Sequence, residues 1–161
     1  MKSIDESEYK KAAGLLRYDP KSGLMWREYT SSGWKVSGCV DRQQGYVLIK
    51  AGGSKLLKAH RLATYIMEGH VPQVIDHING IRNDNRWCNL RGCTHAENIR
   101  NQKSLKKYKG VYARKDRRAA SISYNGISHY LGRFQSDIDA AKAYNEMAIK
   151  LHGKFARLNI V

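Results

Sequence analysis

The segment from Ile75 to Asn98 constrains the fold of this chain more than any other part of it. It concentrates side chains that bind metal ions, accept protons or contact anions. Asn79-Gly80 suits a turn after a short strand, and Thr94-His95-Ala96-Glu97 has the form of a capping box that begins a helix. The pattern predicts a strand, a loop, a second strand and a helix.

The chemistry of this segment follows from three of its residues. If the motif folds back on itself, Asp76 on the strand and Asn98 on the helix can present two oxygens to one cation. His77 then points to the other side of the strand. Phosphodiester hydrolysis needs a base that deprotonates water and a cation that stabilises charge on the phosphate and the leaving 3′ oxygen. Oxygen ligands favour a hard ion, so we expect Mg²⁺ or Mn²⁺.

The charge balance points to a polyanionic partner. The chain has 29 Lys and Arg against 14 Asp and Glu, a net charge of +15 at pH 7. This is far more charge than solubility needs. Residues 60–101 carry only +1, whereas residues 102–161 hold 13 basic and 4 acidic groups, or +9. We therefore expect the last third of the chain to contribute most to binding nucleic acid.

Length and composition exclude several classes of protein. A chain of 161 residues has room for one ordinary domain or two small ones, not for a large multidomain enzyme. Its apolar stretches are only a few residues long, against roughly 20 for a bilayer span, so we expect no membrane association. Residues 1–10 include acids and no apolar run, so no secretory signal is predicted. Three cysteines are too few for a disulfide framework, and a cytoplasmic location is expected.

Hydrophobic spacing predicts two helices before the central segment. Tyr9, Ala12, Ala13 and Leu16 follow helical spacing, and a turn signal at residues 19–23 ends that pattern. Short strands are predicted around residues 24–26 and 46–50, and helical spacing returns from residue 60 to 69.

With its motifs in view, the central segment resembles the HNH endonucleases, the ββα-metal family, and closely their phage and intron homing-endonuclease branch. The matching residues are Asp76-His77-Ile78-Asn79-Gly80, Asn89-Leu90-Arg91, Thr94 and Glu97-Asn98, with Ala59-His60-Arg61-Leu62 before them. The resemblance implies His77 as general base and Asp76 and Asn98 as metal ligands. It also implies that Asn89 braces the loop and orients His77. His60 is expected to pack in the core, with a DNA contact as the alternative.

The last third of the chain predicts a second module after a linker at residues 102–107. Strand patterns occupy residues 111–114, 119–124 and 127–134, and Asn125-Gly126 is a strong hairpin signal. Ser136 followed by Asp139 suits the start of a helix, and Gly153 suits its end. The result is a three-stranded antiparallel sheet covered by one helix.

Residues 108–160 resemble the plant ethylene-response-factor (APETALA-two) DNA-binding domain, in the variant attached to phage HNH nucleases. The quoted matches include Tyr108-Lys109-Gly110-Val111, Tyr130-Leu131-Gly132-Arg133-Phe134 and Gly153-Lys154-Phe155. In that family the sheet enters the major groove, and Arg114 matches a reading arginine. Tyr112 and Ser128 replace usual arginines, so the plant target sequence does not carry over. The DNA-contacting residues expected on a basic, aromatic strand face are Lys109, Tyr112, Arg114, Arg117, Arg118 and Arg133, with Tyr124 beside them.

The sequence thus predicts an α+β protein: an HNH endonuclease domain at 1–101, with its ββα-metal motif at about 74–101, a linker, and a DNA-binding domain at 108–161. The expected activity is metal-dependent hydrolysis of double-stranded DNA by a homing-type enzyme. We expect it to be phage-encoded, to work in a bacterial cytoplasm and to need no protein partner. Two alternatives remain open, a catalytically inactive sequence-specific DNA-binding regulator and a weakly specific nicking enzyme for repair or packaging.

Overall fold

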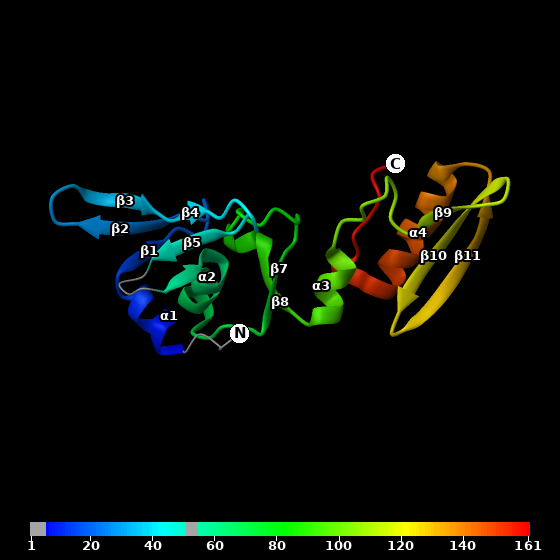
Figure 1. The fold of residues 1–161 in the computed structure, drawn as a ribbon. Helices are drawn as coiled ribbons and strands as arrows, with labels where there is room; N and C mark the ends of the chain where they lie inside the picture. The colour runs from blue at the N-terminus through cyan, green and yellow to red at the C-terminus, as the bar shows by residue number, and fades with distance from the viewer. Residues whose placement is uncertain (1–5, 51–54) are drawn as a thin grey trace. The chain divides into compact units, whose positions relative to one another are not determined.

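The computed structural model describes residues 6–50 and 55–161 (Figure 1). The chain forms two compact units, Met1–Thr94 and His95–Val161, whose relative positions are not determined. Both units mix helices with small antiparallel sheets, which confirms the α+β class.

The first unit is built from short elements arranged as three small sheets. Its sheets have the strand orders β1-β2-β3, β4-β5-β6 and β7-β8. The bounds are α1 Glu6–Ala13, β1 Leu16–Tyr18, β2 Met25–Tyr29, β3 Gly33–Ser37, β4 Cys39–Val40, β5 Val47–Lys50, β6 Leu56–Lys58, α2 Ala59–Glu68, β7 Val74–His77, the 3₁₀ turn η1 Trp87–Asn89, and β8 Leu90–Cys93.

One core joins the helices and strands of this unit. Tyr9 of α1, Ile49 of β5 and Leu62 of α2 are at most 2% exposed and lie in the same apolar cluster. The helical spacing read from the sequence ran on to Leu16, whereas α1 ends at Ala13 and Leu16 begins β1. Gly14 follows the helix directly, and glycine is a poor helix former. Leu16 is still buried, but it reaches the core from a strand.

The second unit matches the predicted three-stranded sheet and helix. Its elements are α3 His95–Asn101, β9 Val111–Arg114, β10 Arg117–Tyr124, β11 Ile127–Phe134, α4 Asp137–His152 and the 3₁₀ turn η2 Gly153–Phe155. The sheet is antiparallel with the order β11-β10-β9, and α4 packs across it (Figure 1).

Local signals fix the ends of these elements. Asn125 and Gly126 have φ angles of 49° and 80°, as the predicted two-residue hairpin turn requires. The side chain of Ser136 accepts a hydrogen bond from the backbone N–H of Asp139 at 3.1 Å, which caps α4. Both sequence predictions are confirmed.

Helix α3 joins the second unit at its last turn. The ammonium of Lys109 donates to the carbonyl oxygens of Arg100 and Gln102, so it binds the carboxyl end of the helix. The predicted ββα motif includes this helix, whereas the compact units divide after Thr94. The functional boundaries of the two modules stay a prediction.

None of the helices in the described ranges has the length and apolar character of a membrane-spanning segment. Within the described residues, none of the three cysteines, Cys39, Cys88 and Cys93, forms a disulfide bond.

Candidate functional site

Asp76 and His77 end strand β7 and are both 5% exposed. The neighbouring strand places Arg91 directly opposite Asp76. The Arg91 guanidinium donates from Nε and Nη2 to Asp76 Oδ2, at 2.9 Å and 2.6 Å. Arg91 belongs to the Asn89-Leu90-Arg91 motif, but only the β7–β8 register shows that it pairs with this carboxylate.

Polar and aromatic groups surround His77. Its Nε2 lies 3.3 Å from Asn85 Oδ1, and its ring centroid lies 5.0 Å from that of His60 and 6.0 Å from that of Tyr46. Burial lowers the pKa of His77, against the opposing effects of the Asn85 hydrogen bond and the Asp76 charge. The imidazole is therefore neutral at neutral pH, which is the state a general base requires.

The loop between β7 and β8 is braced by its own amide and carboxylate groups. Asn89 is 6% exposed; its Oδ1 accepts from the backbone N–H of Asn79 at 2.9 Å and its Nδ2 donates to the carbonyl oxygen of Asp84 at 2.7 Å. Arg86 donates twice to Asp84, at 2.8 Å and 2.6 Å, and these bonds hold the pKa of that carboxyl down at about 2. The geometry supports a bracing role for Asn89, while Asn85 is the amide whose hydrogen bond reaches His77.

A second set of bonds ties this loop to the start of the chain. The Tyr18 hydroxyl donates to the carbonyl oxygen of Asn85 at 2.7 Å. The backbone N–H of Trp87 donates to the carbonyl oxygen of Pro20 at 2.9 Å. Gly23 has φ +75°, and a Cβ there would lie 2.4 Å from the backbone nitrogen of Arg86. Only glycine allows this approach.

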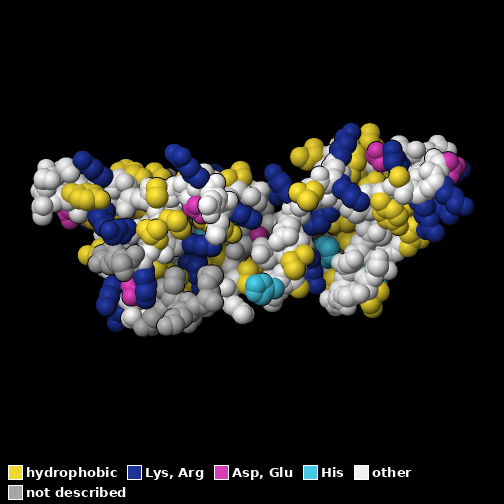
Figure 2. Space-filling model, in the orientation of Figure 1, with side chains coloured by type: hydrophobic (Ala, Val, Ile, Leu, Met, Phe, Trp, Pro, Cys, Tyr) yellow, Lys and Arg dark blue, Asp and Glu magenta, His cyan; other side chains and the backbone are white. Residues whose placement is uncertain are grey.

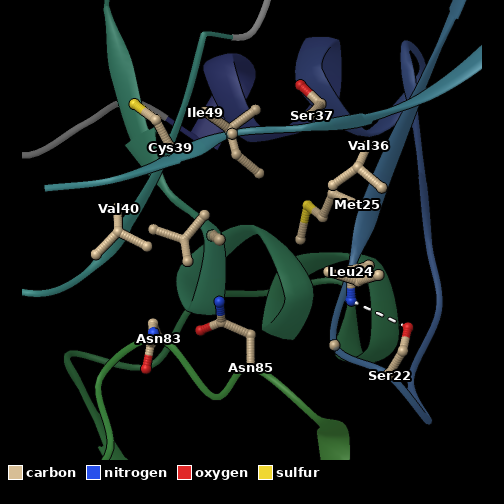
Figure 3. A pocket seen from close by; sticks show the side chains of 14 residues that line it. Ser22, Leu24, Met25, Val36, Ser37, Cys39, Val40, Ile49, Asn83 and Asn85 are labelled. Atoms are coloured by element: carbon tan, nitrogen blue, oxygen red, sulfur yellow. Dashed lines mark hydrogen bonds between the residues drawn. The ribbon is translucent and has the colours of Figure 1, made fainter.

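An apolar cavity of about 270 Å³ lies on the far side of Asn85 (Figure 3). Met25, Val36 and Ile49 line it, with the amides of Asn83 and Asn85 at one edge. The side chain of Asn85 is directed toward these apolar residues, so one amide borders both the cavity and the imidazole of His77.

Asn98, the second predicted ligand, is half-buried on α3 and so belongs to the second unit. In the described residues no three His, Cys, Asp or Glu side chains are grouped as a metal cluster. A carboxylate and an amide are nevertheless hard oxygen donors of the kind that Mg²⁺ or Mn²⁺ prefers, so the donor chemistry of Asp76 and Asn98 fits such an ion. Their pairing stays a prediction.

The sheet of the second unit carries a basic outer face, turned away from α4. Cross-strand pairs share a face, and Tyr112 and Arg133 both pair with Ala119, while Arg114 pairs with Arg117. The exposed Tyr130 also lies on this side, with the Arg114 guanidinium 5.4 Å from its ring centroid. Lys and Arg side chains gather where β9 and β10 connect (Figure 2).

The expectation of one shared face is wrong for Arg118 and Tyr124. Successive side chains of a strand point to opposite faces, and Arg117 lies on the outer face. Counting along β10 from Arg117, Arg118 and Tyr124 both fall on the side that packs against helices. Arg118 Nε pairs with Asp137 Oδ1 of α4 at 3.0 Å, and Tyr124 lies under the guanidinium of Arg100. Lys109 is also partly buried, and burial lowers its pKa while it binds the end of α3.

Comparisons with known proteins find a family similarity in the central segment. Residues 57–100 match a family model described as HNH endonuclease. The chain is also 35% identical over 107 residues to an uncharacterized HNH endonuclease of Acanthamoeba polyphaga mimivirus, an alignment that covers 64% of this chain. It spans 57% of that relative's length. No solved structure matches the chain significantly.

The matched segment runs from β6 to α3 and includes Asp76, His77, Asn89 and Asn98. It ends before the sheet of the second unit. Residues 57–100 are therefore similar to the HNH endonucleases, the class that both comparisons name.

Proposed function

We propose that this protein is a metal-dependent DNA endonuclease of the homing type, with His77 as the general base. The observation that carries the proposal is the buried imidazole of His77, directly after Asp76 in strand β7 and inside the segment that matches the HNH family. Asp76 and Asn98 would hold the cation, as Mg²⁺ or Mn²⁺. When bound, such an ion stabilises negative charge on the phosphate and on the leaving 3′ oxygen.

The residues around His77 prepare it for this task. The imidazole takes a proton from water, the water oxygen attacks phosphorus, and the bond to the 3′ oxygen breaks. Asn85 fixes the direction of the ring through Nε2, and the His60 and Tyr46 rings hold it in place while excluding bulk water. Asn89 keeps the loop that carries Asn85 in its shape.

The second unit would position the enzyme on double-stranded DNA. We propose that it acts as the ethylene-response-factor-like module does, with the outer sheet face meeting the groove. Arg114, Arg117 and Arg133, with Tyr112 and Tyr130, supply cations for phosphates and donors for base edges. The relative from a virus supports a viral origin for the protein, and we propose that it is phage-encoded and works in a bacterial cytoplasm.

One contact favours the alternative of a catalytically inactive DNA-binding regulator. The Asp76–Arg91 pair engages the carboxylate with a cation of the chain itself, at 2.6 Å. A cation arriving at Asp76 competes with that guanidinium. An inactive protein would keep the ion pair in the presence of Mg²⁺.

Incubation with supercoiled plasmid, with Mg²⁺ or with a chelator, tests the proposal. An active endonuclease converts the plasmid to nicked or linear forms only in Mg²⁺, and the His77→Ala variant does not. Mapping the ends separates a homing enzyme, which cuts one site, from a weakly specific nicking enzyme, which cuts many. Wild-type protein that binds DNA but leaves the plasmid intact over a range of Mg²⁺ and Mn²⁺ concentrations would establish the regulator instead.

A further inference from the structure

Two cations share one aromatic ring beside His77. Lys58 Nζ lies 4.2 Å from the centroid of the Tyr46 ring, and the Arg82 guanidinium carbon lies 5.2 Å from it. The same ring lies 5.0 Å from that of His60 and 6.0 Å from that of His77. Residues distant in the sequence thus bring two positive charges to the ring that lies beside both imidazoles.

Neither cation forms an ion pair in the described part of the chain. Arg82 donates to the carbonyl oxygen of Gln44 at 2.9 Å, a neutral partner. Burial lowers the pKa of Lys58, and the charges of Arg61 and Arg82 lower it further, with Asp41 alone acting in the opposite direction. Like charges held together without a carboxylate partner raise the free energy of the folded state, and an anion would relieve that repulsion.

The amino end of helix α2 adds to this positive field. Lys58 is the residue directly before the helix, the first turn holds no acidic residue, and no side chain caps it. The first backbone N–H groups of a helix lack partners within it and carry its positive dipole end. A lysine there is the reverse of the usual preference, which is an acid.

An independent feature marks the same place as polar and unsatisfied. His60, in the first turn of α2, is 5% exposed, and its Nδ1 is buried without a hydrogen-bond partner in the described residues. The centroid of its ring lies 5.0 Å from that of Tyr46 and 5.0 Å from that of His77. Burial lowers the pKa of His60 to about 3, so it adds no charge of its own.

We infer that Lys58, Arg82 and the amino end of α2 form a binding site for one backbone phosphate of DNA, next to the position where His77 acts. The inference rests on the proposed function, since it assigns a phosphate contact of the same active site. The site fixes the strand relative to the imidazole. Lys58 and Arg82 are thus positioning residues for the cleavage reaction.

Inorganic phosphate probes the site without any cleavage. Metal-free protein is titrated with phosphate while NMR follows the imidazole resonances of His60 and His77. In the wild-type protein these resonances shift as phosphate is added, until the site is saturated. Lys58→Gln and Arg82→Gln each weaken the apparent affinity by about tenfold, the effect of removing one charged hydrogen-bond donor. Lys35→Gln, the same change at an exposed residue of β3, leaves the affinity unaltered.

DNA binding in chelator then identifies the phosphate as that of the backbone. The double variant K58Q/R82Q lowers the slope of log affinity against log salt by about one, on specific and scrambled duplexes alike. An unchanged slope, or phosphate affinity equal to wild type in both single variants, overturns the inference. If the wild-type protein cuts plasmid but the salt slope or the phosphate affinity is unchanged in the variants, the phosphate site is refuted and the endonuclease proposal stands. If the site binds DNA phosphate and no cutting occurs, the endonuclease proposal fails instead.

Discussion

The loop that carries Asn85 depends on one buried side chain, which makes Asn89→Ala an informative change. The substitution removes one hydrogen bond from the N–H of Asn79 and one to the carbonyl of Asp84. Each bond contributes roughly 1 kcal/mol net, and a backbone group left buried without a partner costs up to about 3 kcal/mol. Both loop groups are partly buried. We therefore expect the unfolding free energy of the first unit to fall by about 2–4 kcal/mol.

Tryptophan fluorescence measures this loss in the first unit alone. The three tryptophans, Trp26, Trp34 and Trp87, all lie before Thr94. Urea unfolding should show a lower midpoint with an unchanged m-value, since the surface exposed on unfolding stays the same. Asn83→Ala is the matched control, because Asn83 is exposed and its side chain makes no hydrogen bond within the described residues. It should change the free energy by less than about 0.5 kcal/mol.

The comparison of these two variants decides whether Asn89 holds the loop in its shape. A loss below about 1 kcal/mol in Asn89→Ala, close to that of Asn83→Ala, would refute the view that Asn89 holds the loop. A large loss of plasmid nicking with no loss of stability would place Asn89 at the substrate instead.

Four further outcomes follow from the structure. His77→Ala should slow plasmid nicking by roughly 10²–10⁴-fold while leaving DNA affinity in chelator unchanged, and equal nicking rates would remove the proposed base. Burial lowers the pKa of His60 to about 3, so the unfolded chain takes up a proton as pH falls below about 6.5. Stability of the first unit should then be full above pH 6.5 and about 2 kcal/mol lower at pH 5, and His60→Leu should flatten this dependence in urea titrations. Gly23→Ala should cost more than about 1 kcal/mol because its Cβ meets the Arg86 backbone at a positive φ, and a stable variant would contradict the close approach. Arg114→Ala should relax sequence preference in duplex binding, whereas Arg118→Ala, on the opposite face, should leave it intact; equal effects would show that the sheet face does not select the contacts.

Local sequence signals determined most elements of this protein. The Asn125-Gly126 turn and the Ser136 cap act over four residues or fewer, and the structure has both where the sequence predicts them. The strand predicted at 119–124 begins two residues earlier, at Arg117. The strand, loop, strand and helix of the central segment are likewise local. The motifs from Asp76 to Asn98 also carried the resemblance to the HNH endonucleases, because that chemistry depends on residue types at fixed intervals.

Local signals failed where neighbours in space replaced neighbours in sequence. Helical spacing continued to Leu16, but Gly14 ends the helix and Leu16 reaches the same core from a strand. Arg118 looked equivalent to Arg117 in composition. Helix α4 covers one side of the sheet. Arg117 lies on the opposite, outer face, whereas Arg118 lies on the covered side and pairs with Asp137.

The surroundings of His77 belong entirely to the tertiary structure. Strand pairing brings Arg91 to Asp76, and the folded loop brings Asn85 to the imidazole. Tyr46, just before β5, and His60, in α2, place their rings beside that of His77. The sequence indicated His77 as the proposed base and Asp76 and Asn98 as the proposed metal ligands, since residue types and their spacing carry the resemblance. The pKa of His77, its hydrogen-bond partner and the adjacent cations depend on burial and on distances across the fold, which no local pattern encodes.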